Sequence, residues 1–127
     1  MKYLKTYNKI NEGLRDKMVG KSKEELIDSL KDEYRHIKLE KGLEYGILEL
    51  VKMAVDEGAD INAFPAYIRD AVKSGNLELV KYLLDNDIKI WEGVNPHPTI
   101  VAISEKDVDM LKLLKEYGLE VDANSNT

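Results

Sequence analysis

The chain has 127 residues, of which 43% are hydrophobic and 34% are charged, and a net charge of −5, a composition typical of one ordinary globular domain. The absence of cysteine excludes disulfides and thiolate metal sites. No apolar run approaches the roughly 20 residues of a membrane span, and lysines interrupt the start where a secretory signal would be apolar, so we expect a cytoplasmic protein.

Residues 1–21 are predicted to form a basic amphipathic arm. Residues 1–23 hold seven basic and two acidic side chains, whereas the remainder has a net charge of −10, which argues against a nucleic-acid surface on the body. The apolar side chains of the arm recur at spacings of three and four residues, as on one face of a helix. These arm residues are Tyr3, Tyr7, Ile10, Leu14 and Met18.

Three interpretations of the arm stay open. It packs on the domain as a lid, or it is a docking or sorting tag that another protein binds in a groove, and the pattern fits these two equally. A membrane-surface helix is a weaker third alternative, because the apolar stripe is narrow and rich in tyrosine. The opening residues are also similar in style to the starts of tailed-bacteriophage proteins, although no specific motif carries this similarity.

Residues 22–34 are predicted to contain a cap helix that covers the first unit of the body. Ser22 followed three residues later by Glu25 is a capping box, and Leu26, Ile27 and Leu30 then form an apolar stripe.

The body is predicted to consist of three copies of a helical hairpin, over residues 35–62, 63–91 and 92–122. The sequence LELVK begins at Leu48 and again at Leu77, and a third version of it begins at Val108, after a nearly equal interval. Each copy contains two short apolar stripes of helical period separated by a turn. Helices this short are marginal alone, so we expect the copies to stack and bury their apolar faces against one another. Residues 123–127 are predicted to be a frayed tail.

A small residue precedes the turn of each hairpin, four positions before it in all three copies. These residues are Gly42, Ala71 and Ala102. A side chain that is nearly absent allows the two helices joined by a tight turn to approach closely, so we expect all three positions to lie in helix–helix contacts.

These copies resemble the ankyrin repeat. The second helix of that family commonly reads GHLEVVKLLLENGADVN, and residues 46–62 read GILELVKMAVDEGADIN, while residues 75–88 read GNLELVKYLLDNDI. Pro98, four residues before Ala102, stands at the proline of the family's TPLHxAA motif. The resemblance covers roughly residues 35–122 and implies an all-α, ankyrin-like helical-hairpin solenoid of about three repeats that binds a protein partner.

The copies are shorter than the family period, which is about 33 residues. The missing residues fall between copies, where ankyrin repeats build projecting β-hairpin fingers. We therefore expect fingers trimmed to tight turns, and the concave face made by the first helices as the better candidate binding surface.

The partner-binding residues predicted on this face come from the second copy and from the segment that follows it. They are Tyr67, Arg69, Asp70, Lys73, Trp91 and His97. Tyrosine and tryptophan are enriched among residues that dominate interface energies. Phe64 is interpreted as filling a gap left by a shortened finger, and Trp91 fits either role.

The sequence contains no sign of catalysis. Two histidines are too few for a typical zinc site, and there is neither a phosphate-binding loop nor a nucleophile elbow. We predict no catalytic residues, no metal and no cofactor. The expected function is that of a non-enzymatic adaptor or inhibitor that binds a protein partner. The alternatives are self-association and a structural or packaged cargo protein of a phage-like particle, in the host-cell cytoplasm or the virion, with the arm as its tag.

Overall fold

The computed structural model describes residues 21–91 and 96–119, and every regular element in these two ranges is an α-helix. None of these helices is long and apolar enough to span a membrane. The predicted arm lies outside the described residues, apart from Lys21. The helices are α2 (Lys23–Leu30), α3 (Arg35–Tyr45), α4 (Leu48–Asp56), α5 (Ala66–Ser74), α6 (Leu77–Asp85), α7 (Pro98–Ser104) and α8 (Val108–Glu116).

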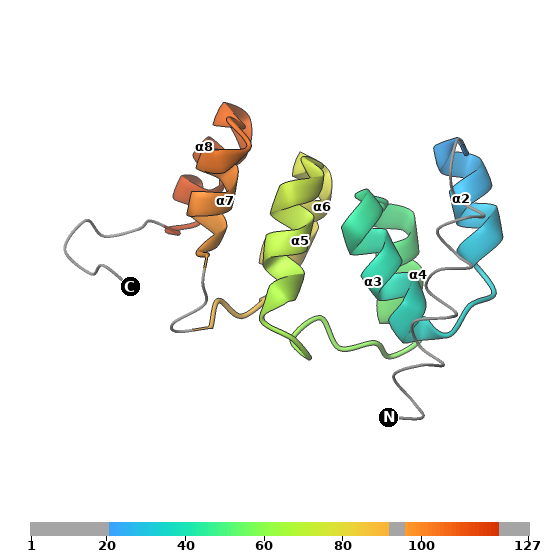
Figure 1. Cartoon of the computed structure of the whole chain (residues 1–127). Helices are drawn as coiled ribbons and strands as arrows, with labels where there is room; N and C mark the ends of the chain where they lie inside the picture. Colours follow the sequence, from blue (N-terminus) through green and yellow to red (C-terminus); the bar gives the residue numbers. More distant parts are fainter. Residues whose placement is uncertain (1–20, 92–95, 120–127) are drawn as a thin grey trace, which may run out of the picture.

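Six of these helices form three stacked hairpins. Figure 1 shows α3, α5 and α7 side by side in one row, with α4, α6 and α8 behind them in a second row. Leu48, Leu77 and Val108 are each the first residue of a nine-residue second helix, so the repeat read from the sequence is confirmed in register. Equivalent positions two residues further on, Leu50, Leu79 and Met110, are all completely buried. The fold is therefore the predicted all-α solenoid.

The small residue before each turn lies where two helices touch. A Cβ atom added to Gly42 would stand 2.8 Å from Cγ2 of Val51 and 3.1 Å from its backbone nitrogen, so α3 and α4 are in contact there. Ala71 and Ala102, at the same position in the later copies, are completely buried. The predicted packing role of these residues is confirmed.

The hairpin turn imposes a left-handed backbone even where glycine is missing. Gly46 and Gly75 follow α3 and α5 with φ of 68° and 80°. Lys106 occupies the same position after α7 and has a φ of 57°. A side chain makes this conformation unfavourable by roughly 1–2 kcal/mol, so the stacking of the third hairpin, rather than its local sequence, enforces the turn.

Two asparagines join the first and second hairpins, one at the turn end of the hairpins and the other at the loop end. The side chain of Asn76 caps α6 through its oxygen and donates from Nδ2 to the carbonyl of Gly46, at 2.6 Å. At the other end, Oδ1 of Asn62 accepts the backbone N–H of Lys89 at 2.6 Å. No strand occurs in the described part of the inter-copy segments, which agrees with the expectation that the fingers are trimmed.

Helix α2 covers the outer helix of the first hairpin. Ser22 is its N-cap, accepting the N–H of Glu25, and completely buried Leu30 packs in a cluster with Ile47 and Leu50. The ammonium of Lys38, which is buried at the start of α3, donates to the carbonyl of Lys31 at 2.9 Å and pairs with the carboxylate of Glu57.

Candidate partner-binding face

Four of the six predicted contact residues lie on α5, the middle helix of the front row. Asp70 and Lys73 are exposed, Arg69 is half-buried, and Tyr67 is only 4% exposed. Trp91 and His97 lie between α6 and α7, and the segment between them includes residues outside the described ranges. The arm residues Tyr3, Tyr7, Ile10, Leu14 and Met18 also lie outside the described residues, so their docking face stays a prediction.

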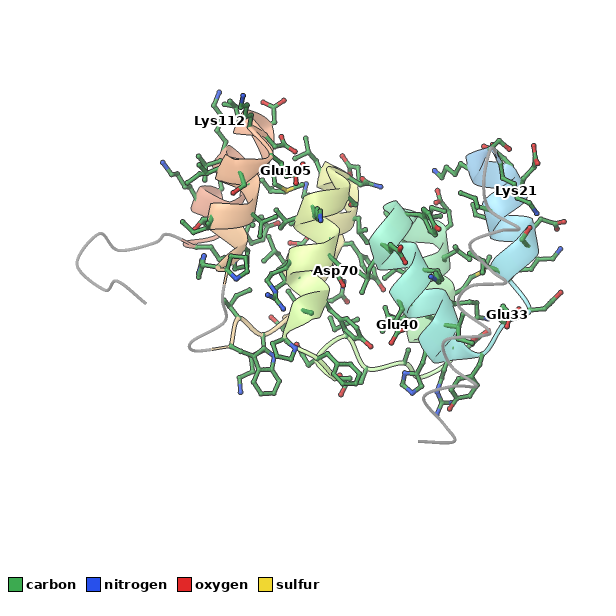
Figure 2. All side chains as sticks on the ribbon, in the orientation of Figure 1. Lys21, Glu33, Glu40, Asp70, Glu105 and Lys112 are labelled. Carbon is green, nitrogen blue, oxygen red and sulfur yellow. The ribbon has the colours of Figure 1, made fainter. Side chains whose placement is uncertain are left out.

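A cleft of about 750 Å³ lies between α3 and α5. Its lining includes three carboxylates and one cation, and we call it the acidic cleft. The lining includes Glu40 and Glu44 from α3, Asp70, Lys73 and Tyr67 from α5, and Phe64 from the preceding loop. Figure 2 shows Glu40 and Asp70 on neighbouring sides of the two helices.

Two carboxylates of the acidic cleft, Asp70 and Glu44, are only partly neutralised by the chain itself. Desolvation raises the pKa of Asp70; nearby Arg69 and Lys73 oppose this increase, and Glu44 and Glu40 add to it. Glu44 pairs with the ammonium of buried Lys41 at 3.1 Å, and its own side chain is 43% exposed. Among the described residues no lysine or arginine forms an ion pair with Asp70. The carboxylates of the cleft are therefore accompanied by nearby cations of the chain, Lys41 beside Glu44 and Arg69 and Lys73 beside Asp70.

Tyr67 forms part of the floor of the acidic cleft instead of an exposed contact. Its hydroxyl oxygen is buried and has no hydrogen-bond partner among the described residues. Burial, together with the charges of Glu40, Asp60 and Asp70, raises the pKa of the hydroxyl to about 12, so it stays protonated at neutral pH. A buried hydroxyl without a partner is destabilising by about 1–3 kcal/mol, which makes Tyr67 an unusual residue in an otherwise apolar core.

Sequence reasoning missed three residues of this cleft. Phe64, interpreted as a gap filler, is instead 56% exposed and its ring stands edge-on to that of Tyr67, with 5.5 Å between centroids. Glu40 and Glu44 were not singled out. When the first copy is aligned on the second, Glu40 and Glu44 stand at the positions of Arg69 and Lys73. This alignment could have predicted that they lie on the same face.

Trp91 and His97 take part in local contacts near the beginning of the third hairpin. The ammonium of Lys89 lies 4.6 Å from the centroid of the Trp91 ring, a cation–π contact that leaves the tryptophan half-buried. His97 is the N-cap of α7, and its Nδ1 accepts the backbone N–H of Thr99 at 3.2 Å. Nδ1 of His97 and the hydroxyl of Thr99 also lie 2.8 Å apart.

The His97 cap should make folding dependent on pH. Burial lowers the pKa of His97, and a protonated Nδ1 cannot accept the N–H of Thr99. The unfolded chain therefore binds a proton more readily, and the contribution of the cap is present above the unfolded pKa of about 6.5 and is lost as the pH falls through the lowered folded value. His97→Asn retains a capping side chain but has no titrating group at this position. We therefore expect its free energy of unfolding to fall by about 1 kcal/mol less than that of the unchanged protein when the pH is lowered.

Urea unfolding of the unchanged chain and of His97→Asn at pH 7.5 and pH 5 measures this difference. The other histidine, His36, is present in both proteins, so its contribution cancels in the comparison. An equal loss of stability in the two proteins would exclude His97 as the source of the pH dependence.

No group of three or more histidine, cysteine or acidic side chains in the described ranges is arranged to hold a metal ion.

Stacked helical hairpins with an open face of polar side chains define a repeat protein of the class that binds other proteins. The family model for ankyrin repeats, in three copies, matches residues 36–126. The chain belongs to the ankyrin repeat family, whose members generally mediate protein–protein interactions without catalysing reactions.

Two curated relatives are ankyrin repeat proteins of fowlpox virus (strain NVSL). The chain is 32% identical to FPV115 over 82 residues, which is 63% of this chain and 15% of the relative. It is 36% identical to FPV024 over 76 residues, which is 58% of this chain and 13% of the relative. The chain thus matches less than a sixth of the length of either protein. No solved structure is significantly similar to it.

Proposed function

We propose that the chain is a non-enzymatic adaptor or inhibitor that holds a protein partner on the face formed by α3, α5 and α7. The observation that carries this proposal is the acidic cleft between α3 and α5, where polar side chains that do not build the core gather on the front row of helices. The outer ends of Asp70 and Lys73 face solvent, while the helix that carries them is fixed by buried Ala71 and Val72.

The binding mechanism is rigid shape and charge complementarity. Because α5 packs against α3 on one side and α7 on the other, its side chains are preorganised and little backbone entropy is lost on binding. Ile100 on α7 occupies the place that Arg69 has on α5 and is 39% exposed, so it adds an apolar contact beside the charged ones.

Site-specific photocrosslinking in the source cell tests which face is used. We expect a benzophenone amino acid at Lys73 to capture the partner covalently. The same amino acid at Lys81, an exposed lysine of α6 in the second row, should capture little or none. Equal capture at both positions, or capture only from Lys81, would exclude the front row as the binding face.

The role as an adaptor or inhibitor and the location in the cytoplasm are both part of this proposal. Mass spectrometry of the crosslinked product also distinguishes self-association, because the partner is then a second copy of the chain. The alternative of a packaged protein of a phage-like particle depends on the arm and gains no support from the described residues.

A further inference from the structure

The third hairpin exposes apolar side chains at positions that are buried in the first two hairpins. Aligning the copies places Ile103 of α7 at the position of Leu43 in α3 and Val72 in α5. Leu43 and Val72 are 0% and 1% exposed, whereas Ile103 is 56% exposed. The three residues share a helix position and an apolar character, so the difference comes from what lies beside each hairpin.

The second row of helices repeats this observation. Val51 and Val80 are completely buried, and Leu111, at the same position of α8, is partly exposed. The first two hairpins are each followed by another hairpin, whereas α7 and α8 are the last helices of the described row (Figure 1). Ile103 and Leu111 therefore occupy positions that contact the next unit of a stack.

Two further apolar residues lie on the same side of the third hairpin. Ile100 stands at the position of Glu40, which lines the cleft between α3 and α5. Val108 stands at the position of Leu77, which lines the groove between α6 and α8. Both positions thus border the following hairpin, and here they are 39% and 62% exposed. We call these four apolar residues the end face: Ile100, Ile103, Val108 and Leu111.

The other end of the stack is covered by a helix with a charged exterior. Helix α2 packs on the first hairpin through completely buried Leu30. Its exposed residues are Lys23, Glu24, Glu25 and Asp28. An apolar surface placed against these side chains would remove their hydration without replacing it. A second copy of the chain therefore does not extend the stack head to tail.

We propose that the end face binds the end face of a second copy of the chain, so that two stacks meet about a two-fold axis with α7 and α8 at the centre. Such an interface is self-complementary and closes at two copies. It continues the packing of hairpin on hairpin that already builds each chain. The acidic cleft between α3 and α5 takes no part in it, so the inference does not depend on the proposed function.

The charges of the third hairpin allow two copies to approach. Residues 96–119 carry four acidic and three basic side chains, so two end faces meet without a large excess of one sign. Asp109 and Lys112 correspond to residues of α6 that line the groove towards α8, and they lie at the edge of the end face. With both signs present, a two-fold axis can bring a carboxylate of one copy against an ammonium of the other.

The basic arm of the same chain is a poorer occupant. It joins the described residues at Lys21, next to α2, and Figure 1 shows α2 at the opposite end of the row from α7 and α8. The arm would have to pass the first two hairpins before it reached the end face.

The size of the end face limits the strength of the dimer. Helix α8 has nine residues, which at about 1.5 Å per residue is a length of about 14 Å, and the end face is two helices or about 20 Å wide. Such a surface buries less than the roughly 1,200 Å² of the smallest stable complexes. We expect a dissociation constant on the order of 100 µM.

Sedimentation equilibrium of the full-length chain from about 10 µM to about 1 mM tests the assembly. The weight-average mass should rise from 14.5 kDa towards twice that value. A mass that stays at 14.5 kDa over this range overturns the proposal. A mass that continues to rise beyond two copies also overturns it, because an open chain of copies requires two different surfaces.

Ile103→Glu places a carboxylate in the end face and should weaken the association at least about tenfold. Phe64→Glu is the matched control, because Phe64 and Ile103 are both 56% exposed but Phe64 lies in the loop before α5. The control should associate like the unchanged chain. Equal weakening by the two variants overturns the proposal.

A spin label on one chain locates the contact without disturbing Ile103. Ser104→Cys carries a nitroxide at the last residue of α7, and the chain has no cysteine of its own. We mix this chain, without isotope label, with the unchanged ¹⁵N-labelled chain. Amide signals of α7 and α8 in the labelled chain should broaden.

Other patterns of broadening identify other occupants. Broadening of α2 means that copies stack head to tail, and broadening of residues 1–20 means that the arm of one copy covers the end face of the other. Either pattern overturns the proposal, as does a rise in mass with no broadening of α7 and α8. If Lys73 captures a different protein while the chain stays monomeric, this inference fails and the proposed function stands.

Discussion

Gly42→Val is expected to lower the free energy of unfolding by about 3 kcal/mol. The first added carbon would already lie 2.8 Å from Cγ2 of Val51, and backbone atoms lie at 3.1 and 3.2 Å behind it. The Val51 side chain can rotate, but the backbone nitrogen of Val51 and the carbonyl of Ile47 cannot move without separating α3 from α4. Urea unfolding followed by circular dichroism measures the loss.

Gly42→Ala provides the decisive comparison, because glycine to alanine inside an ordinary helix stabilises by about 1 kcal/mol. Here we expect the sign to reverse. Adding Val51→Ala removes one of the clashing atoms, so the double variant should lose less stability than the sum of the two single changes. A stabilising Gly42→Ala would mean that the two helices separate easily and that the small-residue position is not a packing requirement.

Leu30→Ala is expected to be destabilising by about 2–4 kcal/mol, the range for removing a buried leucine side chain. Leu30 is completely buried against Ile47 and Leu50, and it is the only completely buried residue of α2. Its loss should release α2 and expose the apolar side of α4 to water. The same unfolding measurement gives the size of the effect, and hydrogen exchange of the α4 amides should accelerate.

Asp28→Ala is the matched control on the same helix. Asp28 is exposed and pairs with Lys31 at 2.8 Å across the helix surface, so its removal should change stability by less than about 0.5 kcal/mol. If Leu30→Ala has as small an effect as Asp28→Ala, α2 does not cap the stack and the interpretation of residues 22–34 is wrong.

The repeated hairpins were predictable because their cause is local and recurrent. Each second helix repeats its apolar stripe, and the same inward positions are buried in all three copies, as at Leu50, Leu79 and Met110. The N-cap of α2 was likewise readable, since a capping residue and its target lie three positions apart in the chain.

The acidic cleft was only partly predictable. Asp70 and Lys73 follow from the helical period, which assigns outward positions on α5. Tyr67 was predicted as a contact residue, but periodicity does not distinguish the rim of a helix from the floor between two helices, where its side chain lies with 4% exposure. Phe64 was interpreted as a gap filler, and its 56% exposure could not be predicted, since the path of a loop depends on the two helices it joins.

The sequence by itself therefore determined the stack of ankyrin repeats, because an apolar stripe of helical period shows which side of each helix has to be buried. Only the tertiary structure decided which side chains of different copies meet. Glu40 and Asp70 belong to different copies and are distant in the chain, yet they line one cleft because α3 and α5 lie side by side. That proximity is set by the spacing between stacked hairpins, a distance that no single copy encodes.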